Sequence, residues 1–179
     1  MLKGGFIGFG RMGITHFSIL NSHDSVEIVA ICDSSKTLMN VLRKYTDINT
    51  YADYHDMLER EALDFVIVST PSGSHAEVIK KAIDYNIHTF TEKPFTLTPE
   101  EGKDILRHLG SKVLVNQVGY VNRFNEVFEE IKRLLDADVI GEVKNFSSEM
   151  YGPTVLKDTK GNWRGKRKMG GGCMYEFAS

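Results

Sequence analysis

Cysteine is scarce in this sequence, which contains only two, Cys32 and Cys173, far apart in the chain. Small secreted domains usually rely on several disulfides, so we expect both thiols to be reduced and the protein to be cytoplasmic. The chain begins almost directly with the apolar segment Leu2–Gly8, which leaves no room for a secretory signal peptide.

Long apolar runs and an excess of one charge are also missing. No apolar segment approaches the roughly 20 residues that a membrane-spanning helix requires. The 22 Lys and Arg residues nearly balance the 24 Asp and Glu residues, so the formal net charge is only −2. This balance argues against a nucleic-acid or membrane partner. The single basic cluster, 157–168, predicts a solvated loop because glycines and a tryptophan interrupt it.

Short apolar segments alternate with amphipathic ones along the first two thirds of the chain. This alternation predicts the α/β class, with a doubly wound parallel sheet covered by helices. The expected strands are Leu2–Gly8, Val26–Cys32, Phe65–Val68, Ile87–Thr91 and Lys112–Val115. The expected helices are Met12–Leu20, one from a Ser34-Ser35 cap to Tyr45, Asp53–Arg60, Ser74–Tyr85 and one starting at Thr98.

The pattern changes after Asn116. Apolar residues recur at helical spacing over 124–135, which predicts an amphipathic helix with its apolar stripe in a core. Val143–Tyr151 is predicted to be a strand, and an irregular segment then leads to a triple glycine at 170–172. We therefore place a dinucleotide-binding Rossmann domain at 1–119. Residues 120–179 are expected to begin an incomplete, truncated α+β domain, a compact appendage being the alternative.

A glycine-rich hexapeptide between the first expected strand and helix carries the strongest functional signal. It reads Gly8-Phe9-Gly10-Arg11-Met12-Gly13, the G-x-G-x-x-G pattern of dinucleotide-binding turns. Gly8 permits the tight turn, Gly10 lets the backbone approach a pyrophosphate, and Gly13 lets the helix pack closely on the strand. The helix N-terminus would offer its free N–H groups to the phosphates.

An acidic residue, Asp33, follows the second expected strand twenty residues after Gly13. Its carboxylate is expected to accept hydrogen bonds from the adenosine ribose hydroxyls, with Ser34 beside it. A 2′-phosphate would meet a like charge there, so NAD is favoured over NADP. Lys36 and the serine hydroxyls would offset part of that repulsion.

Two further groups follow later strands and so belong to the same edge of the sheet. Thr70-Pro71 and His75 come after the central strand, where ligands of open α/β sheets bind, although a capped helix start with an incidental histidine is an equal alternative. Glu92-Lys93-Pro94 follows the next strand. Lys93 beside a nicotinamide would stabilise an alkoxide or pass a proton, with Glu92 holding its ammonium group. A surface Glu–Lys pair is the alternative.

The order and spacing of these motifs resemble those of the Gfo/Idh/MocA oxidoreductases, relatives of glucose–fructose oxidoreductase and inositol dehydrogenase. Tyr120-Val121-Asn122-Arg123-Phe124 looks like the family's Tyr-x-x-Arg-Phe stretch, and Gly170-Gly171-Gly172 looks like the start of its active-site helix. The resemblance implies an NAD(P)-dependent enzyme acting on a sugar, sugar derivative or cyclitol, with a second domain that often mediates homo-oligomerisation.

The resemblance also assigns roles to individual residues. Lys93 corresponds to the active-site lysine, and Thr70, Pro71, His75 and Glu92 would lie on the nicotinamide side of the site. Tyr120 and Arg123 would lie near the substrate. Glu176 stands where the family's last motif has aspartate, and the histidine of that motif falls after Ser179. This departure puts the catalytic competence of the polypeptide in question.

Three interpretations remain open beside a sugar or cyclitol dehydrogenase. One is a dehydrogenase of UDP-sugars in polysaccharide synthesis, and the others are a non-catalytic dinucleotide sensor and an inactive fragment. Trp163-Arg164 could cover a polar substrate or simply anchor an exposed loop. No metal site is expected, because five histidines show no ligand spacing: His16, His23, His55, His88 and His108.

Overall fold

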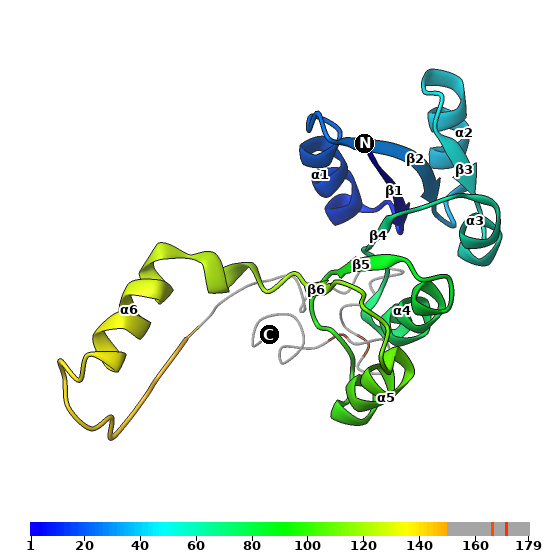
Figure 1. Ribbon diagram of the computed structural model, residues 1–179. Helices are drawn as coiled ribbons and strands as arrows, with labels where there is room; N and C mark the ends of the chain where they lie inside the picture. The colour runs from blue at the N-terminus through cyan, green and yellow to red at the C-terminus, as the bar shows by residue number, and fades with distance from the viewer. Residues whose placement is uncertain (150–165, 167–170, 172–179) are drawn as a thin grey trace.

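The computed structural model describes residues 1–149, 166 and 171. They form one six-stranded sheet in which every pairing is parallel (Figure 1). The strands are β1 Leu2–Ile7, β2 Val26–Cys32, β3 Asn49–Tyr51, β4 Phe65–Val68, β5 His88–Thr91 and β6 Asn116–Val118. Their order is β3-β2-β1-β4-β5-β6, which is the doubly wound Rossmann arrangement.

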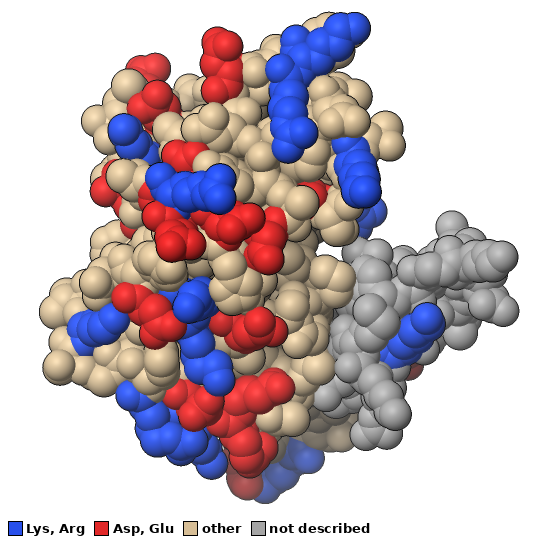
Figure 2. Space-filling view, turned by 90° about the vertical axis from the view of Figure 1, so that its right-hand side faces the viewer, with Lys and Arg blue, Asp and Glu red and all other residues tan. Residues whose placement is uncertain are grey.

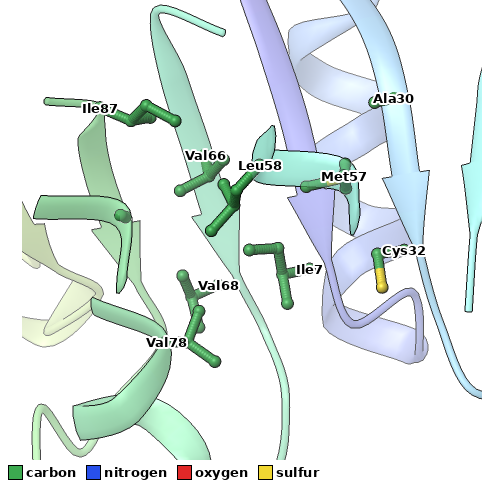
Figure 3. Close-up of a cluster of buried hydrophobic side chains, with 10 residues drawn as sticks. Ile7, Ala30, Cys32, Met57, Leu58, Val66, Val68, Val78 and Ile87 are labelled. Carbon is green, nitrogen blue, oxygen red and sulfur yellow. The ribbon is translucent and has the colours of Figure 1, made fainter. Parts of the chain in front are cut away.

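Helices cover both faces of this sheet. The helices of the described residues are α1 Arg11–Leu20, α2 Lys36–Tyr45, α3 Tyr54–Arg60, α4 His75–Asp84, α5 Pro99–Leu109 and α6 Glu126–Asp136, with short 3-10 helices η1 Ser72–Ser74 and η2 Val121–Phe124. Of these, α6 does not lie on the sheet. Neighbouring side chains of a strand point to opposite faces, so Phe6 packs with α1 and α2 while Ile7 packs with α3 and α4. Figure 3 shows the hydrophobic core on the face covered by α3 and α4, where Met57 and Leu58 of α3 approach Ile7.

Two helices begin with the side-chain caps that their sequences predict. The Ser35 side chain caps α2 by accepting a hydrogen bond from the Leu38 N–H at 3.4 Å. At α5 the Thr98 hydroxyl accepts from the Glu101 N–H, and the Glu101 carboxylate accepts from the Thr98 N–H in return. Pro99 occupies the first turn, so the predicted beginnings of both helices are confirmed.

Two strand predictions were wrong and one strand was missed. The last strand was expected at Lys112–Val115 but is Asn116–Val118, because Thr89 of β5 pairs with Asn116. Val113 is instead 96% exposed. The three-residue strand β3 at the sheet edge is too short and too polar to be predicted from its pattern. The described part of the expected strand Val143–Tyr151, up to residue 149, contains no strand.

The apolar stripe of residues 124–135 was predicted to be core, and this was wrong for the described structure. Phe124 is 72% exposed, Val127 65% and Phe128 53%. In Figure 1, α6 projects away from the sheet, so no described element covers this face. Periodicity predicts that a helix has an apolar face, but it does not say what packs against that face.

Charged side chains of both signs are intermixed over the face shown in Figure 2, in keeping with the nearly balanced composition. One of the ion pairs links α4 to α5, where Lys80 Nζ lies 2.9 Å from Asp104 Oδ2. Their hydrogen bond raises the pKa of Lys80 and lowers that of Asp104. Among the described residues, no helix is both long enough and apolar enough to span a bilayer.

Two buried threonines of β5 lead to a stability prediction. The hydroxyls of Thr89 and Thr91 have no hydrogen-bond partner among the described residues, and their side chains are almost completely buried. An unsatisfied buried hydroxyl costs stability, whereas valine has nearly the same shape without it. We expect Thr91→Val to raise the free energy of unfolding by about 1 kcal/mol, as measured by urea denaturation.

The matched control is the same substitution at a threonine whose hydroxyl accepts a hydrogen bond. Thr98→Val removes the N-cap of α5 and is expected to lower the free energy of unfolding by about 1 kcal/mol. A Thr91→Val protein that is less stable than the unaltered chain would contradict the account of β5.

Candidate cofactor site and lysine turn

The glycine-rich turn lies at the point where the strand order reverses, between β1 and β4. Gly8 has φ of +87°, and a Cβ there would lie 2.7 Å from the Ser69 carbonyl carbon. The Ser69 hydroxyl also donates to the Gly8 carbonyl oxygen at 2.7 Å. Only glycine fits this close approach of two strand ends. The turn is therefore held at the edge where doubly wound sheets bind their ligands.

The other two glycines of the motif differ in what surrounds them. A Cβ on Gly13 would lie only 2.4 Å from the Gly8 carbonyl oxygen, so α1 packs directly on the turn. A Cβ on Gly10 would meet nothing within 4 Å. Gly10 is also the N-cap of α1, where no side chain caps the helix and no acidic residue occupies the first turn. Open backbone and uncapped N–H groups fit a pyrophosphate.

The non-glycine members of the motif have different environments. Phe9 is 4% exposed, and its ring packs edge-to-face with Phe6 and Phe17. Its side chain therefore belongs to the core, and only its backbone faces the turn. Arg11 is exposed and Met12 is half-buried at the start of α1.

Asp33 lies against the glycine-rich turn at the end of β2. Its Oδ2 accepts a hydrogen bond from the Phe9 N–H at 2.7 Å, and its Oδ1 accepts from the Ser35 N–H at 2.8 Å. Ser34 between them is exposed. The carboxylate thus joins the turn to the start of α2, a structural role that the sequence did not reveal.

Cys32, the residue before Asp33, has a buried thiol at the end of β2. The pKa of Cys32 is raised to about 12, chiefly by burial and further by the carboxylates of Asp53, Asp33 and Asp56. The thiol therefore remains protonated and unreactive.

Glu92, Lys93 and Pro94 form a turn after β5, called the lysine turn below. It lies on the β4 side of the point where the strand order reverses. The Lys93–Pro94 peptide bond is cis, Pro94 is buried, and Glu92 and Lys93 are half-buried. The Tyr120 hydroxyl accepts a hydrogen bond from the Phe95 N–H at 3.4 Å, which brings Tyr120 to this turn. Arg123 lies in the exposed η2 segment just beyond it.

His75 connects the lysine turn to the loop after β4. Its Nδ1 lies 2.8 Å from the Pro94 carbonyl oxygen and its Nε2 3.0 Å from the Thr70 carbonyl oxygen. A neutral ring donates to one of these oxygens, and a protonated ring donates to both. The ring is only 1% exposed, so it can act on a bound cofactor only through the loops that it holds. Pro71, in contrast, is exposed.

Glu92 contacts His16, a histidine to which the sequence assigned no role. Its Oε1 lies 2.7 Å from Nε2 of His16, and the two side chains are 14% and 19% exposed. The Glu92 carboxylate thus contacts α1. Its expected contact with the Lys93 ammonium group stays a prediction. The available signal was helical spacing, because His16 follows Gly13 by three residues and so shares its sheet-facing side.

Several predicted site residues lie outside the described part of the chain: Trp163, Arg164, Glu176, Gly170 and Gly172. Their predicted roles stay predictions. Among the described residues, no group of three His, Cys, Asp or Glu side chains is arranged to hold a metal ion.

The parallel sheet, the glycine-rich turn at its reversal point and the acid after β2 define a nucleotide-binding Rossmann domain. Residues 2–120 match the model of the oxidoreductase family GFO_IDH_MocA, described by its NAD-binding Rossmann fold. The chain belongs to this family, and the resemblance inferred from the motifs is confirmed.

Curated relatives of this chain include inositol dehydrogenases. It is 28% identical over 164 residues to inositol 2-dehydrogenase of Salmonella typhimurium, covering 89% of this chain and 48% of the relative. It is 30% identical over 152 residues to the NAD(+)-dependent scyllo-inositol 2-dehydrogenase of Bacillus subtilis, covering 82% and 44%. An NADP(+)-dependent scyllo-inositol 2-dehydrogenase of the same organism is 29% identical, covering 99% and 49%. The chain spans about half the length of these relatives.

Solved structures agree with this assignment. Scyllo-inositol dehydrogenase of Lactobacillus casei with NAD(H) and scyllo-inositol has a TM-score of 0.71 at 26% identity, covering 79% of this chain and 43% of that one. The WlbA dehydrogenase of Bordetella pertussis with NADH and UDP-GlcNAcA has a TM-score of 0.71 at 25% identity, covering 78% and 43%.

Proposed function

We propose that this protein is an NAD-dependent dehydrogenase that oxidises a hydroxyl-bearing carbon of a cyclitol or related sugar. The observation that supports it most directly is the meeting of two groups at one edge of the sheet. The open backbone at Gly10 lies beside the end of β1, and the Lys93 turn follows β5 at the same carboxyl edge. The inositol dehydrogenases among the relatives support the substrate class.

Different residues would bind the two ends of the dinucleotide. The N–H groups at the start of α1 and the Gly10 backbone would bind the pyrophosphate, and Asp33 the adenosine ribose. The nicotinamide, when bound, supplies the hydride acceptor. The Lys93 ammonium group would stabilise the negative charge that develops on the substrate oxygen, or donate and accept its proton.

The second candidate is a dehydrogenase of a UDP-sugar. The specific observation in its favour is the likeness to the WlbA structure with UDP-GlcNAcA, which matches as well as the inositol enzyme does.

The test measures NADH binding by calorimetry and then turnover, as reduction of NAD(+) to NADH, with a panel of inositols, sugars and UDP-GlcNAcA. We expect NADH to bind and an inositol or sugar to be oxidised. Turnover with UDP-GlcNAcA alone would favour the second candidate. Binding without turnover on any member of the panel would indicate a non-catalytic sensor, and absence of binding would overturn the proposal.

Cofactor preference leads to a prediction at Asp33. A like charge at about 4 Å costs about 1 kcal/mol in bulk water and about 4 kcal/mol at an effective dielectric constant of 20. Because Asp33 is half-buried, we expect Asp33→Asn to shift the ratio of NADP to NAD affinity by roughly tenfold to a hundredfold toward NADP. The affinities of both cofactors for the two proteins give this ratio.

The matched control is Asp64→Asn. Asp64 also accepts a backbone hydrogen bond, from the Lys3 N–H at 2.7 Å, but at the opposite end of the sheet. This variant is expected to lose some stability and to keep the cofactor ratio. An unchanged ratio in Asp33→Asn would show that Asp33 does not determine the preference.

A further inference from the structure

His16 and Glu92 form a contact between two parts of the site that the sequence keeps 76 residues apart. His16 lies on α1, whose N-terminus faces the proposed pyrophosphate position. Glu92 directly precedes Lys93. The pair therefore connects the helix at one half of the dinucleotide site to the lysine turn at the other half.

The surroundings of the Glu92 carboxylate confine it. The His16 ring packs edge-to-face on Phe90, with ring centroids 5.1 Å apart. A Cβ on Gly119, just after β6, would lie 3.6 Å from Glu92 Oε1. Three elements thus meet at this carboxylate: α1, β5 and the end of β6. A hydrogen bond to an ionised group is strengthened when water is largely excluded, and both partners are mostly buried.

The backbone of the turn is held separately from this side-chain contact. The Glu92 N–H donates to the Val68 carbonyl oxygen at 2.9 Å, and the Gly119 N–H donates to the Thr91 carbonyl oxygen at 2.8 Å. Loss of the His16 contact would therefore leave the strand ends paired. It would release the Glu92 side chain beside Lys93.

We propose that His16 is a positioning residue, which holds the Glu92 side chain toward α1 and so keeps its carboxylate, beside Lys93, in the arrangement that receives the nicotinamide half of NAD. This inference rests on the proposed function. It assigns His16 a role that is exerted through Glu92. Its consequence is selective, because the adenosine and pyrophosphate contacts do not depend on Glu92.

The experiment compares two ligands on the whole chain by calorimetry. NADH contains both halves of the cofactor, and ADP-ribose lacks the nicotinamide. His16→Phe keeps an aromatic ring on Phe90 but removes the donor, and His16→Gln keeps a donor of similar reach but removes the ring. We expect His16→Phe to weaken NADH binding about tenfold and to change ADP-ribose binding less than twofold. His16→Gln is expected to retain NADH affinity within about threefold.

The comparison of His16→Asn with His16→Gln tests the inference even if His16→Phe does not fold. His16→Asn carries the same amide as His16→Gln on a shorter side chain, so it should lose NADH affinity selectively, as His16→Phe does. Full NADH affinity in both His16→Phe and His16→Asn would overturn the inference. Equal weakening of NADH and ADP-ribose would also overturn it, because His16 would then act on the packing of α1.

Failure of the proposed function has a different signature. If the unaltered chain binds neither NADH nor ADP-ribose, the proposed function fails and the role of His16 fails with it. If it binds both, the variants test His16 alone.

Discussion

Lys93→Met is expected to lower turnover by about 10² to 10⁴-fold while NADH affinity stays within a few-fold of that of the unaltered protein. Methionine has a similar length but no charge, so it cannot stabilise a developing alkoxide or exchange a proton. Lys93 is half-buried beside the buried Pro94, where water screens its charge less than on the surface. Stopped-flow absorbance of NADH measures turnover, and calorimetry measures binding.

The control is a lysine in a half-exposed ion pair away from the site. Lys80→Met breaks the contact with Asp104 between α4 and α5 and is expected to leave turnover unchanged. If Lys93→Met turned over its substrate at the original rate, the chemical role of the lysine would be refuted. A parallel loss of NADH affinity would indicate a role in binding instead.

Gly13→Ala is expected to destabilise the fold by about 3 kcal/mol or more, because its Cβ would lie 2.4 Å from the Gly8 carbonyl oxygen. The clash is with backbone, so no side-chain rotation relieves it. Gly10→Ala should change the free energy of unfolding by less than about 0.5 kcal/mol, since nothing lies within 4 Å. It should nevertheless weaken NADH binding at least about tenfold, because the methyl group would occupy the surface that the pyrophosphate approaches.

A third glycine provides the reference for these two. Gly102 lies inside α5, where a Cβ would make an ordinary contact 3.4 Å from Thr96 Oγ1. Gly102→Ala should therefore raise the free energy of unfolding by about 0.5 to 1 kcal/mol through helix propensity. Urea denaturation of the three variants gives the order directly. Normal stability in Gly13→Ala, or normal NADH affinity in Gly10→Ala, would contradict the geometry assigned to the turn.

The sequence was most informative where one residue type has a unique physical consequence. Gly8, with φ of +87°, and Gly13, which leaves no room for a Cβ, could be interpreted from the motif alone. It was less informative about partners. His75 was expected to line the site, yet both its ring nitrogens face carbonyl oxygens in a buried position. Composition and spacing do not encode which way a side chain turns.

The exposed face of α6 shows the same limit on a larger scale. The spacing of Phe124, Val127 and Phe128 predicted the helix correctly but not its surroundings, because an apolar stripe requires a partner without specifying one. The position of β6 was also decided by pairing, since the hydrogen bonds of β5 select Asn116 over the more apolar Val113.

The amino-acid sequence by itself determined the alternation of strands and helices, the dinucleotide turn and the family, because local periodicity and glycine geometry act over a few residues. Tertiary structure alone decided that Glu92 pairs with His16, that Asp33 holds the Phe9 backbone and that His75 joins two loops. These contacts connect residues 19 to 76 positions apart. Only the packing of α1, α2 and α4 around the parallel sheet brings such distant groups within hydrogen-bonding distance.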